Sequence, residues 1–387
     1  MNKSEIVILH VFKDEKFFDP TSEHYDSLEN VRNLYYLYTP DNQYKFKYIK
    51  YKEKVILIFD PKEYHRLFSS KEIDVILFHS LRPQFIMLFR YIDKQKIVIW
   101  WSWGGDLYNK IFKELSPLVH VDLYKPLTEQ YIKHEYRKKR TGGIIPLLLK
   151  IKHWYYQRKA IGRIDYFIPC LPIEHKLLSR QQPRFRAKLF PNPYKIRDFP
   201  FVSHQKPGNI LVGNSLTYSN NHLDIFKVIR NISIKEGRKF VIPVNYGWGD
   251  AFGNNPENLI GISGMNPESV IWLKEYLDRE TYFKLFSKMT HAVFGVLRQQ
   301  ALGNIRKCLR EGIKVYLYRD SIVAEELRRE GYVFYTIEDD LNEESLNECL
   351  SLQDAMHNYT LGMSYYDGHL LKEVEKELQA IMNNKKT

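Results

Sequence analysis

Cysteine is scarce in this sequence, and long apolar runs are absent from it. The chain of 387 residues has only three cysteines, Cys170, Cys308 and Cys349, and their spacing fits neither a metal site nor a disulfide framework. We therefore expect free thiols and a reducing compartment. No stretch approaches the roughly 18 consecutive apolar residues of a membrane-spanning helix, and the N-terminal segment MNKSEIVILHVF has no signal-peptide cleavage site after it. These absences favour a globular protein of the cytoplasm.

Several short catalytic motifs are also missing. The chain has no G-x-x-x-x-G-K-[S/T] segment, which argues against a P-loop ATPase. It has no Asp-x-Asp and no His-Glu-x-x-His, so the acidic pair that would hold a divalent metal on a diphosphate is not available. We expect no metal and no other cofactor, and we expect positive or dipolar groups to neutralise a bound phosphate instead.

The length and the apolar content predict two domains of α/β structure. Hydrophobic residues make up 44% of the chain and aromatic residues 14%, which is enough for two cores. Short apolar runs predict buried parallel strands at 6–12, 54–59, 73–79, 97–101, 164–168, 187–190, 209–212, 240–244 and 332–335. We assign 1–200 to an N-terminal Rossmann-like domain, 194–208 to a linker, 209–360 to a C-terminal domain, and 361–387 to a C-terminal helix that can pack back on the N-terminal domain.

The segment AVFGVLRQQALGNIRKCLREGIKVYLYRD, residues 292–320, carries the clearest functional pattern. Its apolar start predicts a strand, the turn Arg298-Gln299-Gln300 follows, and apolar residues at helical spacing come next, before a further apolar run from Val315. This order is typical of a β-loop-α-β unit, in which ligands bind beyond the carboxyl ends of the strands and a helix N-terminus can hold a phosphate. The alternative is an ordinary solvated turn.

Two further strands of the second predicted domain end in loops with Gly and polar residues. Gly213-Asn214-Ser215 follows the strand at 209–212, and Tyr246 lies in the loop after the strand at 240–244. Small residues at a strand-to-helix turn allow a phosphate to approach the backbone, although the G-x-G-x-x-G pattern is absent. For Tyr246, Gln299 and Gln300 the alternative interpretation is plain surface polarity.

Candidate proton acceptors lie at strand ends of the first predicted domain. Asp106 follows the strand at 97–101 and the turn Ser-Trp-Gly-Gly, and a carboxylate there can act either as a helix cap or as a general base. His79 ends the strand at 73–79 and is the second candidate, with a buried structural histidine as its alternative.

The formal charge of +12 is concentrated in one segment. Residues 131–163 contain ten Lys or Arg and one acidic residue, Glu135, together with Leu, Ile, Trp and Tyr residues. This composition is typical of a segment that lies on an anionic membrane surface. A solvated helix and a nucleic-acid-binding patch are the alternatives, and we expect no nucleic acid because the apolar residues cluster as lipid insertion would require.

Three motifs resemble one known family. IWWSWGGDLY at 99–108, ILVGNSLTYSNNHLDIF at 210–226 and Arg-Gln-Gln-Ala-Leu-Gly-Asn at 298–304 resemble segments of the bacterial TDP-N-acetylfucosamine:lipid II N-acetylfucosaminyltransferases, also described as 4-alpha-L-fucosyltransferases of glycosyltransferase family 56. FHSLRP at 78–83 and VIPVNYG at 241–247 are similar to further parts of that family in the same order. Asn304 stands where the family pattern has Thr, and the segment at 131–160 is longer than in the pattern.

The resemblance implies a GT-B glycosyltransferase with two Rossmann-like domains that needs no metal. It would transfer a deoxy or amino sugar such as fucose or N-acetylfucosamine from a nucleoside diphosphate to a lipid-linked or glycan acceptor, for cell-surface polysaccharide synthesis on the inner face of the membrane. The donor would contact residues that the motifs supply: Gly213, Asn214, Ser215, Tyr246, Arg298, Gln299, Gln300, Gly303 and Asn304. Asp106 or His79 would accept the proton of the attacking hydroxyl. A non-catalytic basic protein that binds membranes or nucleic acid, or a sugar-nucleotide epimerase, is the alternative function.

Overall fold

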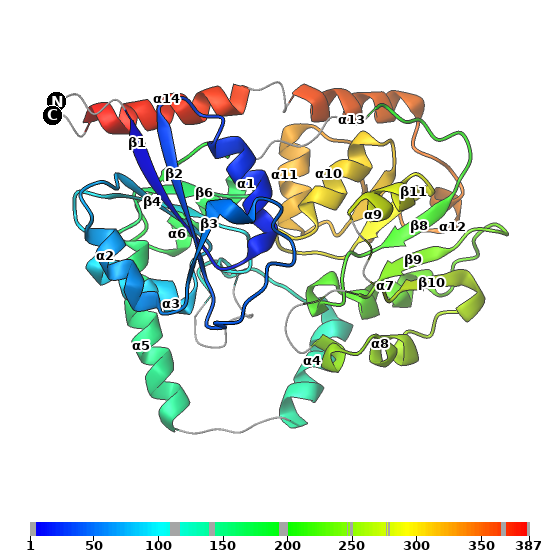
Figure 1. The fold of residues 1–387 in the computed structure, drawn as a ribbon. Coiled ribbons are helices and arrows are strands. Elements are labelled where there is room, and N and C mark those ends of the chain that lie inside the picture. Colours follow the sequence, from blue (N-terminus) through cyan, green and yellow to red (C-terminus); the bar gives the residue numbers. More distant parts are fainter. Residues whose placement is uncertain are drawn as a thin grey trace. The chain divides into compact units, whose positions relative to one another are not determined.

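Two units of α/β structure make up the chain (Figure 1). The computed structural model describes residues 5–108, 117–138, 144–192, 200–245, 247, 251–275, 277, 279–364 and 369–384. Unit 1 comprises Met1–His120, Gly142–Ile196 and Tyr366–Thr387, and unit 2 comprises Val121–Thr141 and Arg197–Tyr365. Each unit contains one parallel β-sheet with helices around it, so the predicted α/β class is confirmed.

Unit 1 is built on a seven-stranded sheet in the order β3-β2-β1-β4-β5-β6-β7. The strands are β1 (Ile6–Phe12), β2 (Val31–Tyr38), β3 (Val55–Ile58), β4 (Val75–His79), β5 (Ile97–Trp101), β6 (Tyr166–Ile168) and β7 (Lys188–Leu189). All neighbouring strands run parallel. The chain first builds outward from β1 to β3 and then returns to the other side of β1 with β4, so the order reverses between β1 and β4. Ligands of open parallel sheets bind at such a point.

Helices cover this sheet and complete its core. They are α1 (Phe18–Tyr25), α2 (Tyr64–Ser69), α3 (Pro83–Ile86), α5 (Ile144–Ile161), α6 (Pro172–Gln181) and α14 (His369–Asn384), with short 3-10 helices at Glu15–Phe17, Lys52–Lys54, Pro61–Glu63 and Met87–Tyr91. Val374, Leu378 and Ile381 lie on one face of α14 and pack into the core with Ile6 and Val75. The end of the chain therefore belongs to the N-terminal unit.

Unit 2 has a six-stranded parallel sheet in the order β10-β9-β8-β11-β12-β13. The strands are β8 (Asn209–Val212), β9 (Phe240–Pro243), β10 (Val270–Leu273), β11 (Met289–Phe294), β12 (Lys314–Leu317) and β13 (Tyr335–Thr336). The order reverses between β8 and β11, whose residues pair directly, Leu211 with Ala292 and Val212 with Val293. The carboxyl ends of β8 and β11 consequently lie side by side at the reversal point.

The helices of unit 2 include one that the sequence places far from the others. They are α4 (Pro126–Lys138), α7 (His222–Ile229), α8 (Pro256–Ile262), α9 (Arg279–Phe286), α10 (Leu302–Arg310), α11 (Ile322–Glu330), α12 (Glu343–Leu346) and α13 (Leu352–Ser364), with 3-10 helices at Tyr218–Asn220, Ala251–Asn254 and Pro267–Ser269.

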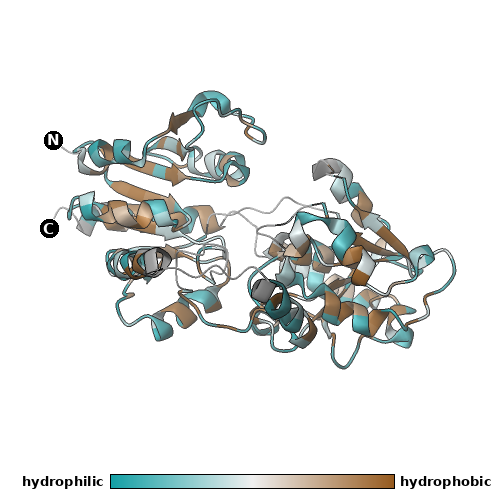
Figure 2. Ribbon diagram, turned by 90° about the horizontal axis from the view of Figure 1, so that it is seen from below, coloured by the Kyte–Doolittle hydropathy of each residue, from teal (hydrophilic) through white to brown (hydrophobic). Residues whose placement is uncertain are grey.

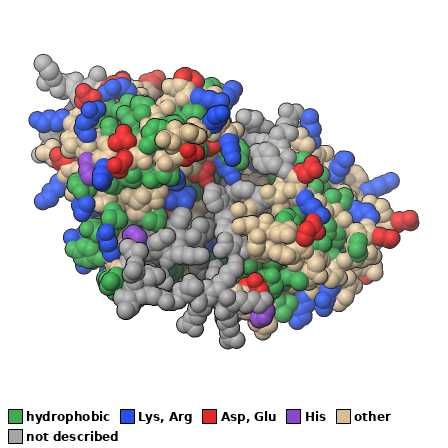
Figure 3. All heavy atoms as spheres, turned by 60° about the horizontal axis from the view of Figure 1, so that its bottom comes forward, with side chains coloured by type: hydrophobic (Ala, Val, Ile, Leu, Met, Phe, Trp, Pro, Cys, Tyr) green, Lys and Arg blue, Asp and Glu red, His purple; other side chains and the backbone are tan. Residues whose placement is uncertain are grey.

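Figure 2 shows apolar residues concentrated in the strands, while the helices carry both apolar and polar residues. Figure 3 shows Lys and Arg side chains distributed over the described surface.

The structure corrects several boundaries. Residues 121–141 belong to unit 2 rather than to the domain predicted for 1–200, because Asp224 of α7 accepts hydrogen bonds from the N–H groups of Leu127 and Thr128 (both 2.9 Å) and so fixes the start of α4. The basic segment at 131–163 is thereby divided between the two units.

Candidate functional site

The strand ends at the reversal point of unit 2 carry two predicted donor-binding loops. Gly213 follows β8 directly, and the turn at Arg298 follows β11 after three apolar residues. Because β8 and β11 are hydrogen-bonded neighbours, the structure brings these two loops together, as the strand-loop-helix pattern of the sequence predicts.

The loop after β8 is held in shape by one buried amide. Asn220 is fully buried, and its Nδ2 donates to the Ser215 carbonyl (2.7 Å), the Ser215 Oγ (3.0 Å) and the Thr217 Oγ1 (3.0 Å). Gly213 has a φ of +69°, and a Cβ at this position would lie 2.8 Å from the His222 Nε2. The turn therefore requires glycine, both for its backbone conformation and for the close packing beneath it.

Hydrogen bonds join the two loops through Gln300. The Gln300 Nε2 donates to the Asn214 Oδ1 (3.2 Å) and to the Thr217 Oγ1 (3.0 Å), while its Oε1 accepts from the Ser219 Oγ (2.5 Å). The Arg298 guanidinium donates to the same Ser219 Oγ (3.4 Å) and to the Gln299 carbonyl (2.7 Å). Arg298 is thus positioned beside the loop that begins at Gly213.

The start of α10 has the properties of an anion-binding site. Its N-cap residue, Ala301, has a φ of +57° and supplies no capping side chain. Gly303 in the first turn is exposed, and a Cβ there would meet no atom within 4 Å. The N–H groups of an uncapped first turn carry partial positive charge and are directed away from the helix. With Arg298 next to them, they can bind a diphosphate.

Two asparagines at this site were not predicted. Asn221, which caps α7 with a φ of +51°, is fully buried; its Nδ2 donates to the Gly295 carbonyl (2.6 Å) and its Oδ1 accepts from the Lys125 N–H (2.7 Å). It therefore ties the loops after β8 and β11 to the segment that leads into α4. Asn220 holds the first loop from inside. The run Ser-Asn-Asn directly before an apolar helical pattern is a helix-start signal that could have indicated both.

The remaining predicted donor residues have varied surroundings. Ser215 is buried, and its hydroxyl accepts a hydrogen bond within the loop, so its predicted contact with a phosphate is not supported. The Asn304 Nδ2 donates to the Tyr282 hydroxyl (3.0 Å), which makes it a support for α10. Gln299 is mostly buried. Tyr246 lies outside the described residues.

His222 lies under the loop at Gly213 and is uncharged. It is buried, and neither ring nitrogen has a hydrogen-bond partner among the described residues. Burial lowers the pKa of His222 to about 4, since the charged imidazolium loses its hydration there. The positive charge of the site therefore comes from Arg298 and the helix start, and not from this imidazole.

Asp106 in unit 1 is a buried structural carboxylate. Its Oδ2 accepts from the Leu81 N–H (2.8 Å) and the Trp100 Nε1 (2.7 Å). Its Oδ1 accepts from the Ser102 Oγ (3.0 Å) and the Trp103 N–H (3.3 Å), and the residue is only 1% exposed. Because four donors occupy its two oxygens, this carboxylate cannot also receive the proton of a substrate hydroxyl without rearrangement. The geometry therefore favours a structural role for Asp106, in which it ties the turn after β5 to Leu81, over the predicted general base; no described helix is capped by it.

His79 lies at the reversal point of unit 1 and is part of a buried histidine pair. The His79 Nε2 and the His10 Nδ1 are 3.0 Å apart, and the His10 Nε2 is 3.0 Å from the Asn33 Oδ1. The His79 ring stacks on Phe12 with centroids 3.8 Å apart, and its Nδ1 has no hydrogen-bond partner among the described residues. Burial lowers the pKa of His79 well below its usual value, with His10 adding to the effect. The imidazole is therefore neutral, and a neutral imidazole has one ring nitrogen that can accept a hydrogen bond.

Two classes of feature are absent from the described part of the chain. Among those residues, no group of three or more His, Cys, Asp or Glu side chains could hold a metal ion. None of the described helices is both long enough and apolar enough to cross a membrane.

Solved structures with this architecture are glycosyltransferases of the GT-B type. Sucrose-phosphate synthase from Thermosynechococcus elongatus matches with a TM-score of 0.64 at 10% identity, covering 98% of this chain and 100% of that chain. HepE from Anabaena, in complex with UDP and glucose, matches with a TM-score of 0.59 at 8% identity over 98% and 100% of the two chains. The apo form of the lipopolysaccharide outer core galactosyltransferase WaaB matches with a TM-score of 0.55 at 12% identity over 97% and 99%. The predicted GT-B fold is confirmed.

The family is shown by the sequence rather than by these distant structures. A family model described as 4-alpha-L-fucosyltransferase, glycosyl transferase group 56, matches residues 150–371. The match contains β8, the loop at Gly213, the turn at Arg298 and α10. It favours a transferase over the non-catalytic and epimerase alternatives. Since it covers more than half of the 387 residues, the chain belongs to glycosyl transferase group 56 and is a glycosyltransferase.

Proposed function

We propose that this glycosyltransferase takes fucose, N-acetylfucosamine or a related deoxy or amino sugar from a nucleoside diphosphate and transfers it to a lipid-linked or glycan acceptor of the cell surface. One observation carries the donor half of the proposal: the loops at Gly213 and Arg298 are hydrogen-bonded to each other beside the uncapped start of α10. The UDP and glucose bound to the HepE neighbour support a nucleotide-linked donor. The family description supports a fucose-type sugar.

The chemistry assigned to unit 2 is neutralisation of the leaving group. In the reaction the acceptor oxygen forms a bond to the anomeric carbon of the sugar, the bond from that carbon to the diphosphate oxygen breaks, and the acceptor hydroxyl loses its proton. Negative charge grows on the departing diphosphate. The Arg298 guanidinium and the first-turn N–H groups of α10 stabilise it electrostatically. The chain has no Asp-x-Asp motif, so we assign this task to these groups rather than to a metal ion.

We assign the proton to His79 rather than to Asp106 because both are buried but only Asp106 has its acceptor atoms occupied by four donors. His79 ends β4 at the reversal point of unit 1, where ligands of such sheets bind, and its Nδ1 has no partner among the described residues. His10 holds the opposite ring nitrogen. Replacing His79 with Gln should lower kcat at least about a hundredfold while leaving the affinity for the nucleotide sugar unchanged, because general bases contribute roughly 10²–10⁴-fold. A variant with near-normal kcat would eliminate His79 as the proton acceptor.

Contact with a membrane is assigned to α5. Leu148, Ile151, Trp154 and Tyr155 are each between 46% and 60% exposed, which is unusual for large apolar side chains so close together. Arg158 lies over the Trp154 ring and Lys159 over the Tyr155 ring, at 4.8 and 4.6 Å from the centroids. Aromatic rings and cations in this arrangement suit the headgroup region of an anionic bilayer.

Nucleotide binding tests the donor assignment. Wild-type protein and Arg298→Gln would be titrated by calorimetry with TDP-, UDP- and GDP-linked sugars and with the matching diphosphates. Wild type should bind at least one of them, and Arg298→Gln should bind it at least tenfold more weakly, because the lost group is a charged donor. The control is the double variant Lys206→Glu, Lys235→Glu, which changes exposed cations elsewhere in unit 2. Equal binding by wild type and Arg298→Gln would refute the assignment.

Vesicle flotation tests the membrane assignment independently. Wild type should float with vesicles that contain anionic lipid and not with neutral vesicles. The double variant Ile151→Ser, Trp154→Ser should lose this association and keep nucleotide binding. Retention of full vesicle binding would show that α5 is not the membrane-contacting surface.

A further inference from the structure

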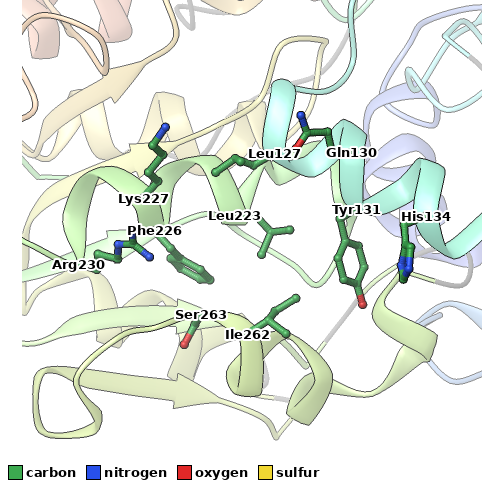
Figure 4. A pocket seen from close by; sticks show the side chains of 10 residues that line it. All are labelled: Leu127, Gln130, Tyr131, His134, Leu223, Phe226, Lys227, Arg230, Ile262 and Ser263. Atoms are coloured by element: carbon green, nitrogen blue, oxygen red, sulfur yellow. The ribbon is translucent and has the colours of Figure 1, made fainter.

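Unit 2 contains a concave site that the donor assignment does not use. Three helices, α4, α7 and α8, line a groove of about 510 Å³ (Figure 4). This volume lies within the range of roughly 300–1,000 Å³ that is common for small-molecule sites. The lining residues are Leu127, Gln130, Tyr131, His134, Leu223, Phe226, Lys227, Arg230, Ile262 and Ser263.

One part of the groove is apolar and solvent-accessible. Leu223 and Phe226 of α7 face Ile262 of α8 across it (Figure 4). Phe226 belongs to the buried core, whereas Ile262, at the end of α8, is 46% exposed. An aliphatic side chain left half in water on the wall of a concave site can gain from contact with a hydrocarbon chain.

The other part of the groove is cationic. Lys227 and Arg230 are three residues apart on α7 and therefore project from the same side of the helix, and both are exposed. In the part of the chain that the structure describes, neither forms an ion pair. No Asp or Glu lines the groove, and His134 lies on its opposite side (Figure 4). The groove therefore presents unneutralised positive charge beside an apolar wall.

The groove is built into the same framework as the donor site. Asp224 of α7 fixes the start of α4 through two backbone N–H groups, and Asn221 accepts from the Lys125 N–H. Tyr131 of α4 packs against Phe252 and Tyr218, with ring centroids 5.4 and 6.2 Å away. Tyr218 belongs to the loop that also supplies Ser219 and Asn220 to the donor site. The two sites therefore share one loop.

We propose that the groove binds a single phosphate-bearing lipid chain, with its phosphate at Lys227 and Arg230 and its hydrocarbon against Leu223 and Ile262. This rests on the proposed function, because it gives the lipid-linked acceptor a subsite of its own in unit 2. Charge complementarity selects the occupant: two cations without an ion-pair partner among the described residues favour an anion, and the adjacent apolar wall favours a hydrocarbon. A sugar alone would use neither feature.

Calorimetry with octyl phosphate below its micellar concentration tests the proposal on the full chain. We expect saturable one-to-one binding by wild type. Hexyl phosphate should bind roughly fifteenfold more weakly, because it lacks two methylenes and each buried methylene changes the affinity about fourfold. Lys227→Glu, Arg230→Glu should weaken octyl phosphate binding at least tenfold, and Ile262→Ser should remove most of the difference between octyl and hexyl phosphate. Thermal unfolding of each variant checks that it is folded.

Matched controls separate the groove from other surfaces. Lys206→Glu, Lys235→Glu makes the same change of charge elsewhere in unit 2, and Ile151→Ser, Trp154→Ser removes exposed apolar side chains from α5. Both double variants should bind octyl phosphate as wild type does. Equal loss of binding in the first would show non-specific charge attraction, and loss in the second would place the ligand on α5. Either result would overturn the proposal.

Other probes identify other occupants. Inorganic phosphate that bound as tightly as octyl phosphate would indicate a site for free phosphate, and equal binding of octyl glucoside would indicate a general apolar surface. A dimer in solution that dissociated in Lys227→Glu, Arg230→Glu would indicate a second copy of the chain. Each of these results contradicts the proposal. The nucleotide titration described for Arg298 is a separate measurement, so the groove assignment can fail while the donor assignment stands, and the reverse.

Discussion

Replacing Gly303 with alanine adds one methyl group to the first turn of α10, where we place the donor diphosphate. Apart from the backbone of α10 and the neighbours of Gly303 in the chain, no described atom lies within 4 Å of the added carbon, so the variant should fold without strain. Alanine favours a helix over glycine by up to about 1 kcal/mol in a helix interior, and a position in the first turn should give somewhat less. Urea unfolding should therefore show a gain of roughly 0.5 kcal/mol in the free energy of unfolding.

The same methyl group should impair donor binding. A diphosphate oxygen must come within about 3 Å of an N–H group to accept its hydrogen bond, and a methyl beside those N–H groups occupies part of that space. We expect the nucleotide affinity to fall at least tenfold, which corresponds to about 1.4 kcal/mol. Calorimetry on the variant measures this directly. A variant that is more stable than wild type and binds nucleotide equally well would show that the diphosphate lies elsewhere.

Gly213→Ala is the informative comparison, because its effect on stability has the opposite sign. Its φ of +69° costs a residue with a Cβ about 1–2 kcal/mol, and the new carbon would lie 2.8 Å from the His222 Nε2. The free energy of unfolding should fall by at least about 1 kcal/mol. If Gly213→Ala were as stable as wild type, the turn described here would be wrong.

Three further changes test separate parts of the structure. Asp106→Asn turns one of two acceptor oxygens into a donor that faces donors, so urea unfolding should show a loss of about 2 kcal/mol or more; unchanged stability would contradict its structural role. Asn221→Ala removes hydrogen bonds to two segments and should lower both stability and nucleotide affinity. If both stayed at the wild-type level, Asn221 would not be needed to hold these segments together. Burial raises the pKa of Glu174 to about 7, so this group makes folding less favourable as pH rises from about 4.5 to 7. Over that pH window the stability of Glu174→Gln should therefore increase relative to that of wild type, by up to about 3 kcal/mol. A stability difference that does not change with pH would refute the pKa shift.

The sequence predicted the central strands of both sheets because those strands are buried on both faces. β1, β4, β5, β8 and β11 consist mostly of buried apolar residues, which is the pattern of a parallel sheet covered on both sides. β2 was missed because its tyrosines and Asn33 resemble a polar segment, although Tyr35 and Leu37 are buried. β10 was missed because it is short and lies at the edge of its sheet, where its burial is incomplete.

The predicted donor site was partly visible in the sequence because local pattern fixes where a strand ends. Gly213 and Arg298 each follow a strand, and the reversal of strand order then brings their loops together. The pattern could not reveal which polar groups have their hydrogen-bonding atoms occupied by other residues of the fold. Ser215 and Asp106 have the side chains that a catalyst needs, yet their oxygens are saturated by neighbours that lie up to 25 residues away in the sequence. Only three-dimensional contacts distinguish a working carboxylate from a structural one.

The two units share a topology but differ in the charge at their reversal points, and this difference suggests a division of tasks. Between β8 and β11 lie a guanidinium and a helix start without a capping side chain, which together favour a dianionic group. Between β1 and β4 lie His10 and His79, both kept neutral by burial, with Phe12 stacked against His79. Neutral surroundings lined by aromatic rings suit an uncharged sugar hydroxyl better than a diphosphate. This contrast in charge supports the proposed assignment of the leaving group to unit 2 and of the attacking hydroxyl to unit 1, even though the sheets are built alike.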